Sequence, residues 1–267
     1  MQRSIGFIGA GNMGRAMIEG IVNSHIVKDI FVYDHHIENL MRFKDIDCIH
    51  LAKDEQEVAL KSDVLVLSVK PYHYKDVLQT IASNLKQNVI LVDIAAGITI
   101  QDVKALVNQE VKVVKAMPNT PALVQQAMTA VSFDDLIQED DKEWIQTLFS
   151  SFGRCEVVEE SLMDAVTCVS GSSPAYVFMM IEAMADAAVK QGMKRKQAYI
   201  FAAQAVLGSA QMVLETKMHP GELKDMVCSP QGTTIDAVYT LEKTGFRASI
   251  MEAMDACAKK SKEMTRK

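Results

Sequence analysis

Ten residues near the amino terminus decide the fold: Ile5-Gly6-Phe7-Ile8-Gly9-Ala10-Gly11-Asn12-Met13-Gly14. A short apolar run is followed by glycines in the spacing Gly-x-Gly-x-x-Gly, and then by an amphipathic helical pattern. Gly9 permits a tight turn, Gly11 lets a ligand approach the backbone, and Gly14 allows close helix–strand packing. The stretch therefore predicts a dinucleotide-binding turn. The residues expected at the cofactor here are Gly9, Gly11, Asn12, Met13 and Gly14.

Outward from this stretch, short β-branched runs alternate with helical patterns. The expected strands are Ile5–Ile8, Ile30–Tyr33, Val64–Val69, Val89–Ile94 and Val111–Ala116, with helices such as Met13–Val22, Tyr74–Leu85 and Ile100–Val107 between them. Nearly continuous apolar strands that alternate with helices are typical of a parallel sheet covered on both faces. Met128–Phe133, a helix over Asp140–Ser151 and Arg154–Val158 extend its far edge. We predict an α/β domain with a Rossmann-like doubly wound sheet over residues 1–160.

The pattern changes near Glu160, because no strand pattern follows it. The expected helices are Leu162–Val169, Ala175–Gln191, Arg195–Leu214, Gly221–Val227, Ile235–Lys243 and Phe246–Lys262. They are rich in Ala and Met and apolar on more than one side, so a single copy would expose too much apolar area. We predict an all-α dimerisation domain over residues 161–267, in a homodimer or a higher homo-oligomer.

Composition excludes several classes of protein. The 267 residues are 49% hydrophobic and 23% charged, with a formal net charge of −6, which disfavours a nucleic-acid partner. No apolar stretch approaches the roughly 20 residues that span a bilayer, and the first strand leaves no room for a signal peptide. The five cysteines and six histidines show no metal-ligand spacing. We expect a cytoplasmic protein without a metal.

Acidic residues follow the second expected strand. A carboxylate at the position of Asp34 normally accepts hydrogen bonds from the adenosine ribose, which favours NAD and repels a 2′-phosphate. Glu55 adds a second acid, whereas His35 and His36 could instead face a phosphate. Asp34 could also merely cap the following helix. The cofactor is therefore expected to be NADPH or NADH, with a modest preference for NADH.

Ligands of such sheets bind at the carboxyl ends of the strands. Val69-Lys70-Pro71, Ala95-Ala96-Gly97 and Pro118-Asn119-Thr120 all lie at such ends. Lys70 could equally be a solvated charge. The cofactor contacts expected from these segments are Val69, Lys70, Ala95, Gly97 and Asn119.

A second informative segment, His219–Thr234, interrupts the helical region. Pro220 can open a short helix and Pro230 must end it, after which Gly232 leads into another helix. Free backbone N–H groups at such a helix start can bind a small carboxylate. Hydroxyls that only cap the helix are the alternative.

This segment is similar to the signature of the Δ1-pyrroline-5-carboxylate reductase family. The resemblance continues, in the family's order, through Gly6–Gly14, Val69-Lys70-Pro71, Pro118-Asn119-Thr120-Pro121 and Ser170–Tyr176. It implies hydride transfer from NAD(P)H to a cyclic C=N bond, which gives L-proline in the last step of proline biosynthesis. It also implies that the strand-end segments line the nicotinamide and that the C-terminal helices interlock with those of a second copy.

The resemblance also implies roles for individual residues. Thr234 would be the hydrogen-bond partner of the ring nitrogen, and Ser229 would assist it at the catalytic site. The residues expected at the substrate are Gly232, Thr233, Glu160 and Ser172. Ser173, Cys228 and Gln231 depart from small residues common in the family.

Three other interpretations are open. The first is a reductase of another cyclic imine acid. The second is a β-hydroxyacid dehydrogenase, which the lack of a lysine before Lys190 in Leu162–Gln191 disfavours. The third is a non-catalytic NAD(P)-binding sensor, which has no need of Ser229, Thr234 and Asn119.

Overall fold

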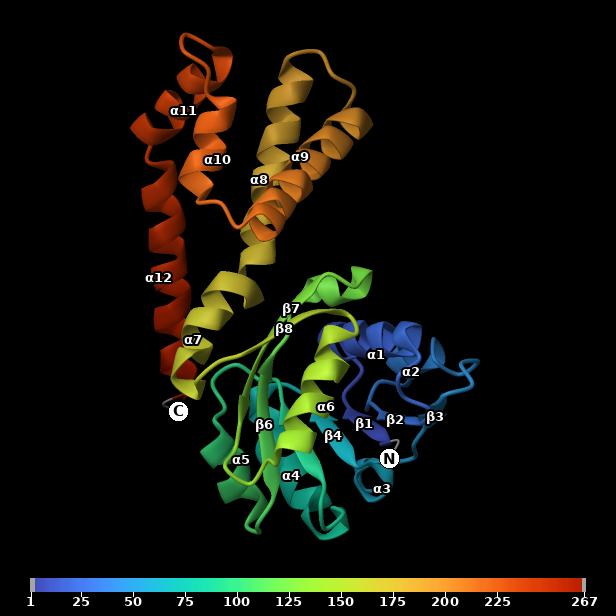
Figure 1. Ribbon diagram of the computed structural model, residues 1–267. Helices are drawn as coiled ribbons and strands as arrows, with labels where there is room; N and C mark the ends of the chain where they lie inside the picture. The colour runs from blue at the N-terminus through green and yellow to red at the C-terminus, as the bar shows by residue number, and fades with distance from the viewer. Residues whose placement is uncertain (1–2, 266–267) are drawn as a thin grey trace. The chain divides into compact units, whose positions relative to one another are not determined.

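The computed structural model describes residues 3–265 and divides into two compact units (Figure 1). Unit 1 comprises the chain up to Ser172 together with the segment from Cys257 onward, and unit 2 comprises Ser173–Ala256. The expected domain boundary between residues 160 and 161 stays a prediction. The outer ends of the two expected domains, residues 1–2 and 266–267, lie outside the described residues.

Unit 1 is built on an eight-stranded sheet with the order β3-β2-β1-β4-β5-β6-β7-β8. The strands are β1 (Ile5–Ile8), β2 (Ile30–Tyr33), β3 (Ile49–Leu51), β4 (Val64–Leu67), β5 (Ile90–Asp93), β6 (Lys112–Met117), β7 (Ala127–Phe133) and β8 (Gly153–Val157). All neighbours are parallel except β6 and β7. The chain turns from one half of the sheet to the other between β1 and β4, where ligands of doubly wound folds bind. The predicted fold class is confirmed.

Helices cover both faces of this sheet. One hydrophobic core joins the sheet to α1 (Asn12–Ser24), α2 (Ile37–Met41) and α6 (Glu139–Ser150). A second core joins its other face to α3 (Glu55–Lys61), α4 (Tyr74–Ile81) and α5 (Ile100–Val107). Every residue of β1 and β4 is buried, which explains why these strands are apolar throughout rather than alternating.

Some elements differ from the expected ones. The short elements β3, α2 and α3 were not predicted, and β4 ends at Leu67 rather than at Val69. Its pairing stops because Leu67 lies opposite Ile8, where β1 gives way to the glycine turn. Helix α4 ends at Ile81 and continues as a 3₁₀ turn instead of reaching Leu85.

The expected helix over 162–169 is replaced by a more irregular segment. A 3₁₀ turn, Glu160–Leu162, leads into α7 (Met163–Val166) and then into a π-helical turn, Thr167–Gly171. The hydroxyls of Thr167 and Ser170 donate to backbone carbonyls four residues earlier. Such bonds bend helices, and π turns occur frequently at functional sites.

Unit 2 is entirely helical, as predicted for this half of the chain. It contains α8 (Ser173–Lys190), α9 (Arg195–Thr216), α10 (Pro220–Val227), α11 (Thr233–Lys243) and the first part of α12 (Phe246–Thr265). Helices α8 and α9 form a hairpin that turns at Gly192, where φ is +96° (Figure 1). Its fully buried residues are small ones, Ala185, Ala198 and Ala202.

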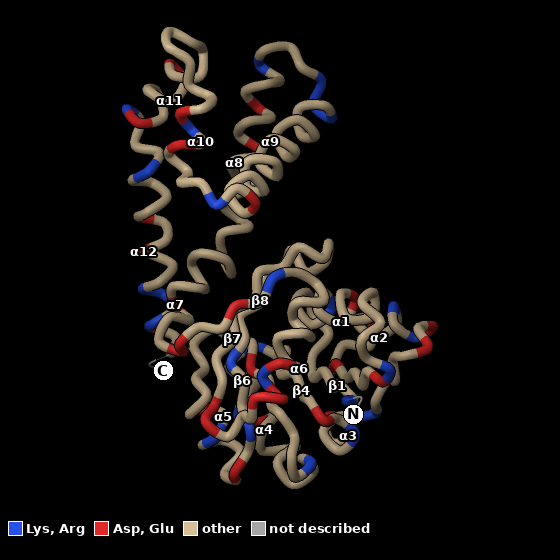
Figure 2. Tube along the Cα trace, in the orientation of Figure 1, with Lys and Arg blue, Asp and Glu red and all other residues tan. Residues whose placement is uncertain are grey.

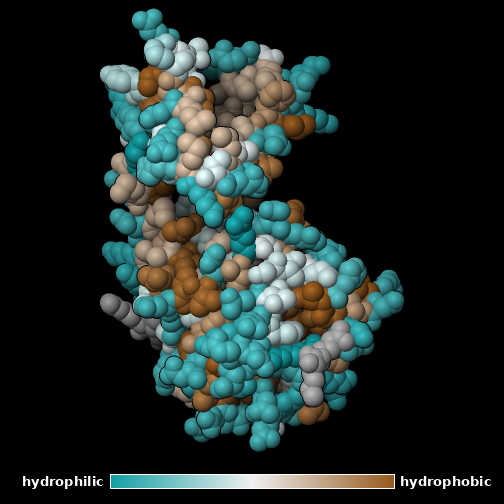
Figure 3. Space-filling model, in the orientation of Figure 1, coloured by the Kyte–Doolittle hydropathy of each residue, from teal (hydrophilic) through white to brown (hydrophobic). Residues whose placement is uncertain are grey.

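The surface of the chain is mixed in charge and partly apolar. Figure 2 shows Lys and Arg interspersed with Asp and Glu, without a stripe of one sign. Figure 3 shows apolar side chains open at the surface over the helices of unit 2. Among residues 3–265, no helix is both long enough and apolar enough to cross a membrane.

Candidate cofactor and substrate sites

The three glycines of the first turn are needed for three different reasons. Gly9 has φ +98°, and a Cβ there would lie 2.5 Å from the Ser68 carbonyl oxygen. A Cβ on Gly14 would lie 2.3 Å from the Gly9 oxygen. At Gly11, by contrast, nothing lies within 4 Å of the Cβ position. Gly9 and Gly14 therefore serve the fold, whereas the open space over Gly11 is room for a ligand.

The start of α1 offers backbone donors to that ligand. Gly11 is its N-cap and supplies no side chain to accept a hydrogen bond from the first turn. Uncapped N–H groups at a helix start, with the positive end of the helix dipole, bind phosphate groups. The turn therefore fits the pyrophosphate of a dinucleotide.

Asp34 ties this turn to the end of β2. Its Oδ2 accepts a hydrogen bond from the Ala10 backbone N–H at 2.7 Å, and its Oδ1 accepts one from the His36 N–H at 2.8 Å. The carboxylate therefore holds the glycine turn against the second strand and brings a negative charge to its edge.

Further acids surround Tyr33 at the same edge. Glu55 Oε1 lies 3.2 Å from His35 Nε2, and the Tyr33 hydroxyl lies 3.3 Å from His35 Nδ1. Burial first, and then the charges of Glu55, Asp54 and Asp34, raise the pKa of Tyr33. The structure thus brings the predicted residues Asp34, His35 and Glu55 together, and their field is negative.

The loops after β4 and β5 place other expected residues at the same side of the sheet. Val69 is half-buried and Lys70 is exposed, and the Lys70 side chain makes no ion pair within residues 3–265. Gly97 has φ +78°, which favours glycine there. The hydroxyl of Ser68, just before Val69, is buried without a hydrogen-bond partner in the described part of the chain.

Asn119 is engaged inside unit 1. The residue is 6% exposed, its Oδ1 accepts from the Met128 N–H at 2.9 Å, and its Nδ2 donates to the Ser170 oxygen at 3.0 Å. The amide therefore links the end of β6 to the start of β7 and to the π turn. In this structure, the Asn119 side chain fixes the loops that follow β6.

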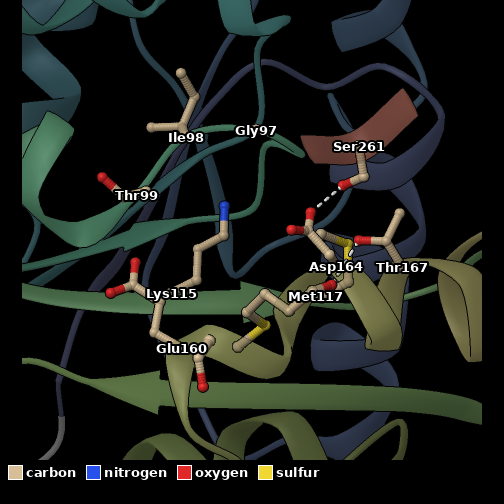
Figure 4. A pocket seen from close by; sticks show the side chains of 11 residues that line it. Gly97, Ile98, Thr99, Lys115, Met117, Glu160, Asp164, Thr167 and Ser261 are labelled. Atoms are coloured by element: carbon tan, nitrogen blue, oxygen red, sulfur yellow. Dashed lines mark hydrogen bonds between the residues drawn. The ribbon is translucent and has the colours of Figure 1, made fainter. Parts of the chain in front are cut away.

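A cavity of about 280 Å³ lies beside the loop after β5 (Figure 4). Glu160 lines it, and its Oε1 accepts a hydrogen bond from the Ile100 N–H at 2.7 Å, at the start of α5. On another wall, the Ser261 hydroxyl donates to Asp164 Oδ1 at 2.5 Å (Figure 4). The lining residues are Gly97, Ile98, Thr99, Lys115, Met117, Glu160, Ser161, Met163, Asp164, Thr167 and Ser261.

A buried ionic network next to this cavity was missed by the sequence analysis. Lys115 and Asp93 are 3% and 0% exposed, and Lys115 Nζ donates to Asp93 Oδ2 at 2.7 Å. A signal was present in the sequence, because Asp93 ends an apolar strand, Lys115 lies among apolar neighbours, and buried charges need partners. Burial is the main cause that raises the pKa of Asp93, and the neighbouring Lys115 opposes it.

The start of α11 carries the residues expected at the substrate in unit 2. Gly232 is the N-cap of α11, without a side-chain cap, and its N–H donates to the Ser229 oxygen at 3.0 Å. Gln231 has φ +57°, so the chain turns sharply before the helix. Thr233 and Thr234 form the first turn, in which Thr234 is half-buried. The geometry leaves backbone donors and hydroxyls together at one helix end.

Ser172, the other residue expected at the substrate, is bonded within unit 1. The Ser172 hydroxyl accepts a hydrogen bond from the Cys257 thiol at 3.3 Å. Within residues 3–265, no group of three or more His, Cys, Asp or Glu side chains could hold a metal ion.

The sheet order and the glycine turn define the class: a dinucleotide-binding protein of the Rossmann type with a helical C-terminal unit. Residues 4–97 match a family model described as "NADP oxidoreductase coenzyme F420-dependent". Residues 160–264 match one described as "Pyrroline-5-carboxylate reductase dimerisation".

Similarity also extends over the whole chain. It is 48% identical to a pyrroline-5-carboxylate reductase of Escherichia coli, covering 100% of both chains. It is 41% identical to that of Methanosarcina acetivorans, covering 99% of both. A solved pyrroline carboxylate reductase of Plasmodium falciparum with NADP bound superimposes with a TM-score of 0.90, at 33% identity over 98% of both chains. The chain belongs to the pyrroline-5-carboxylate reductase family, and the predicted resemblance is confirmed.

Proposed function

We propose that this protein reduces Δ1-pyrroline-5-carboxylate to L-proline with NADPH or NADH, the last step of proline biosynthesis. Full-length similarity to reductases of that name is the observation that carries the proposal. The two uncapped, glycine-preceded helix starts support it, because the reaction needs a dinucleotide and a carboxylate to be held.

Unit 1 supplies the cofactor site in this proposal. The open face of Gly11 and the N–H groups at the start of α1 fit the pyrophosphate, and Asp34 with Glu55 borders the adenosine ribose. Val69, Lys70, Ala95, Gly97 and Asn119 hold or shape the nicotinamide end, and Asn12 and Met13 complete the glycine turn. When bound, the reduced nicotinamide supplies the hydride.

Unit 2 supplies the groups that hold the imine acid. The N–H group of Thr233 binds the substrate carboxylate at the positive end of α11, with Gly232 as the N-cap beside it and Ser229 assisting. The Thr234 hydroxyl forms a hydrogen bond with the ring nitrogen and steadies it as the C=N bond is reduced. Glu160 and Ser172 are the further residues assigned to the substrate in this proposal. A protonated imine is the better hydride acceptor, so the site needs positioned donors and acceptors rather than a strong base.

We also propose a homodimer or a higher homo-oligomer, in a reducing, cytoplasmic compartment. The apolar surface of unit 2 supports the assembly. Independent support comes from the match of residues 160–264 to a family model of pyrroline-5-carboxylate reductase dimerisation. All five cysteines are free thiols, which agrees with a reducing compartment.

A substrate comparison tests the proposed activity. Purified protein is given NADPH or NADH with pyrroline-5-carboxylate or with its six-membered homologue, and cofactor oxidation is followed under steady-state conditions. We expect the five-membered imine acid to have the higher kcat/KM. Efficient reduction of the six-membered acid alone would reassign the substrate, and cofactor binding without turnover of either would indicate a sensor.

A further inference from the structure

Ala95, just after β5, is held by one buried ion pair at both its backbone N–H and its backbone carbonyl. The Ala95 N–H donates to Asp93 Oδ1 at 2.8 Å, and the Ala95 carbonyl accepts from Lys115 Nζ. Lys115 also donates to Asp93 Oδ2 at 2.7 Å. Asp93 and Lys115 are direct neighbours in the register of β5 and β6, so the sheet itself fixes the pair.

Tyr74 supports the same carboxylate from α4. Its hydroxyl lies 2.5 Å from Asp93 Oδ1 and 2.8 Å from the Leu67 carbonyl oxygen, so its single proton is shared between two acceptors. Tyr74 is 1% exposed. Burial is the first cause that raises its pKa well above the ordinary value, followed by the charge of Asp93, so the hydroxyl keeps its proton. The network thereby connects the ends of β4, β5 and β6.

A buried ion pair adds little net stability to a core, because desolvation of the two charges offsets most of their attraction. Apolar residues would pack equally well at the end of a core that is otherwise aliphatic. Apolar side chains, however, cannot form hydrogen bonds with the backbone N–H and carbonyl of Ala95. The network therefore does something that packing alone does not require.

We propose that Tyr74, Asp93 and Lys115 are positioning residues that fix the Ala95–Gly97 loop where it meets the nicotinamide end of the cofactor. This inference rests on the proposed function for the identity of the ligand. It assigns the network to the alignment of the hydride donor and not to the affinity for the adenosine half, which the turn at Gly11 serves. Gly97 continues the loop with φ +78° and lines the cavity beside it, so a shift at Ala95 reaches the site directly.

The test variant is the double substitution Asp93→Asn and Lys115→Met. It removes both charges together, because removal of Lys115 alone leaves a buried and unpaired carboxylate. The amide that replaces the carboxylate keeps an acceptor for the Ala95 N–H, whereas the Ala95 carbonyl loses its ammonium donor. The matched control is Lys112→Met, the same change at the other end of β6, where Asp141 keeps Arg3 as a partner.

Two measurements separate alignment from general stability. We expect kcat at saturating substrates to fall by about 10- to 100-fold in the double variant, as for a reacting group displaced by about 1 Å. The Kd of ADP-ribose, which lacks the nicotinamide, should stay within about twofold of wild type, because its site lies elsewhere. The control should match wild type in both.

Three results would overturn the inference: wild-type kcat in the folded double variant, a loss of ADP-ribose affinity as large as the loss of kcat, or an equal loss in the Lys112→Met control. If wild type itself fails to reduce pyrroline-5-carboxylate, the proposed function is wrong, but the network is still tested. The Kd of the whole reduced dinucleotide should then rise several-fold in the double variant while that of ADP-ribose does not.

If the double variant does not fold, Tyr74→Phe is the substitute. It should lower kcat about threefold with ADP-ribose binding unchanged, and an unchanged kcat would contradict the inference.

Discussion

The two units of this chain treat their large apolar side chains in opposite ways. In unit 1, side chains such as Phe7, Phe149 and Phe152 are fully buried in one of the two cores that cover the sheet. In unit 2, Ile200 and Phe201 on α9 are 67% and 64% exposed, although their helix is as long as any in the chain. Most large apolar side chains of unit 1 are therefore buried within that unit, with exceptions such as Leu60, whereas those of unit 2 need a second copy to cover them.

The two units also differ in the chemistry they provide. In the proposed function, unit 1 contributes mainly backbone N–H groups. The lack of a side chain at Gly11 leaves them accessible, and side chains such as Asp34 hold the turn in place. Unit 2 contributes hydroxyls and N–H groups at the start of α11. Substitutions that act in one unit should therefore leave the other unit's property intact.

The largest effect is expected for Phe201→Glu in unit 2. In the proposed assembly this change puts a carboxylate at an apolar contact between copies, which costs the burial of the ring and the desolvation of the charge, so the dimer Kd should rise by about 10³-fold or more. Leu60→Glu is the control, because Leu60 is 59% exposed on unit 1. Light scattering at sub-micromolar concentration measures both proteins. A Phe201→Glu protein that remains a dimer, or a wild type that is a folded and active monomer, would contradict the proposed assembly.

The next effect concerns the hydroxyl of Thr234. Thr234→Val keeps the shape of the side chain and removes the proposed partner of the ring nitrogen. We expect kcat/KM to fall by about 10²-fold or more, the lower range for loss of a positioned hydrogen bond in the transition state. Cofactor affinity, a property of unit 1, should barely change. Unaltered catalysis in the folded variant would show that the Thr234 hydroxyl has no catalytic role and that the residue serves only in the first turn of α11.

The glycine turn gives a third contrast, within unit 1. Gly11→Ala meets no atom of the protein, so its melting temperature should match wild type while cofactor affinity falls by about tenfold. Gly14→Ala would place a Cβ 2.3 Å from the Gly9 oxygen, so it should lose stability by several kcal/mol. Thermal unfolding and cofactor titration of both variants test the distinction. A destabilised Gly11→Ala protein with normal affinity would reverse the two roles.

A smaller effect is expected for the choice between NADH and NADPH. Two charges about 4 Å apart repel by about 4 kcal/mol at an effective dielectric near 20, before salt screens them, so Asp34 and Glu55 favour NADH modestly. Asp34→Ser should move the ratio of the two kcat/KM values toward NADPH, but it also removes the bond to Ala10. Glu55→Asn removes only a charge and its contact with His35, so it should shift the ratio several-fold at unchanged stability. A wild-type ratio that strongly favours NADPH and responds to neither change would show that these acids do not face the ribose.

The smallest effect is expected at Gln231. Its φ of +57° is unfavourable for residues other than glycine, whereas glycine loses more freedom on folding. Gln231→Gly should therefore change stability by only about 0–1 kcal/mol, in the stabilising direction. Chemical denaturation measures this, and a large loss would mean that the Gln231 side chain makes a contact essential to the turn.

The sequence predicted those features that depend on neighbouring residues. The glycine spacing, the buried strands such as β1 and β4, and the bounds of α5 all follow from local geometry, and α5 carries a complete capping box at Thr99 and Asp102. The strand β3 was missed because it has only three residues, with His50 in the middle, too short for a periodic signal.

The missed part of the site depends on contacts between distant residues. Asp93 and Lys115 are 22 positions apart, and only the register of β5 and β6 makes them a pair. Likewise, the bond between Glu160 and the start of α5 spans 60 positions. The roles assigned to the individual cofactor and substrate residues remain predictions, which the substitutions above test.

Isotope transfer gives the most direct test of hydride transfer by this protein. Reduced cofactor carrying deuterium on the transferring face of its nicotinamide ring is incubated with the protein and pyrroline-5-carboxylate, and the product is examined by mass spectrometry. We expect L-proline that carries one deuterium, at the carbon that was doubly bonded to nitrogen. Unlabelled proline, or no proline while the labelled cofactor remains bound, would contradict direct hydride transfer by this protein.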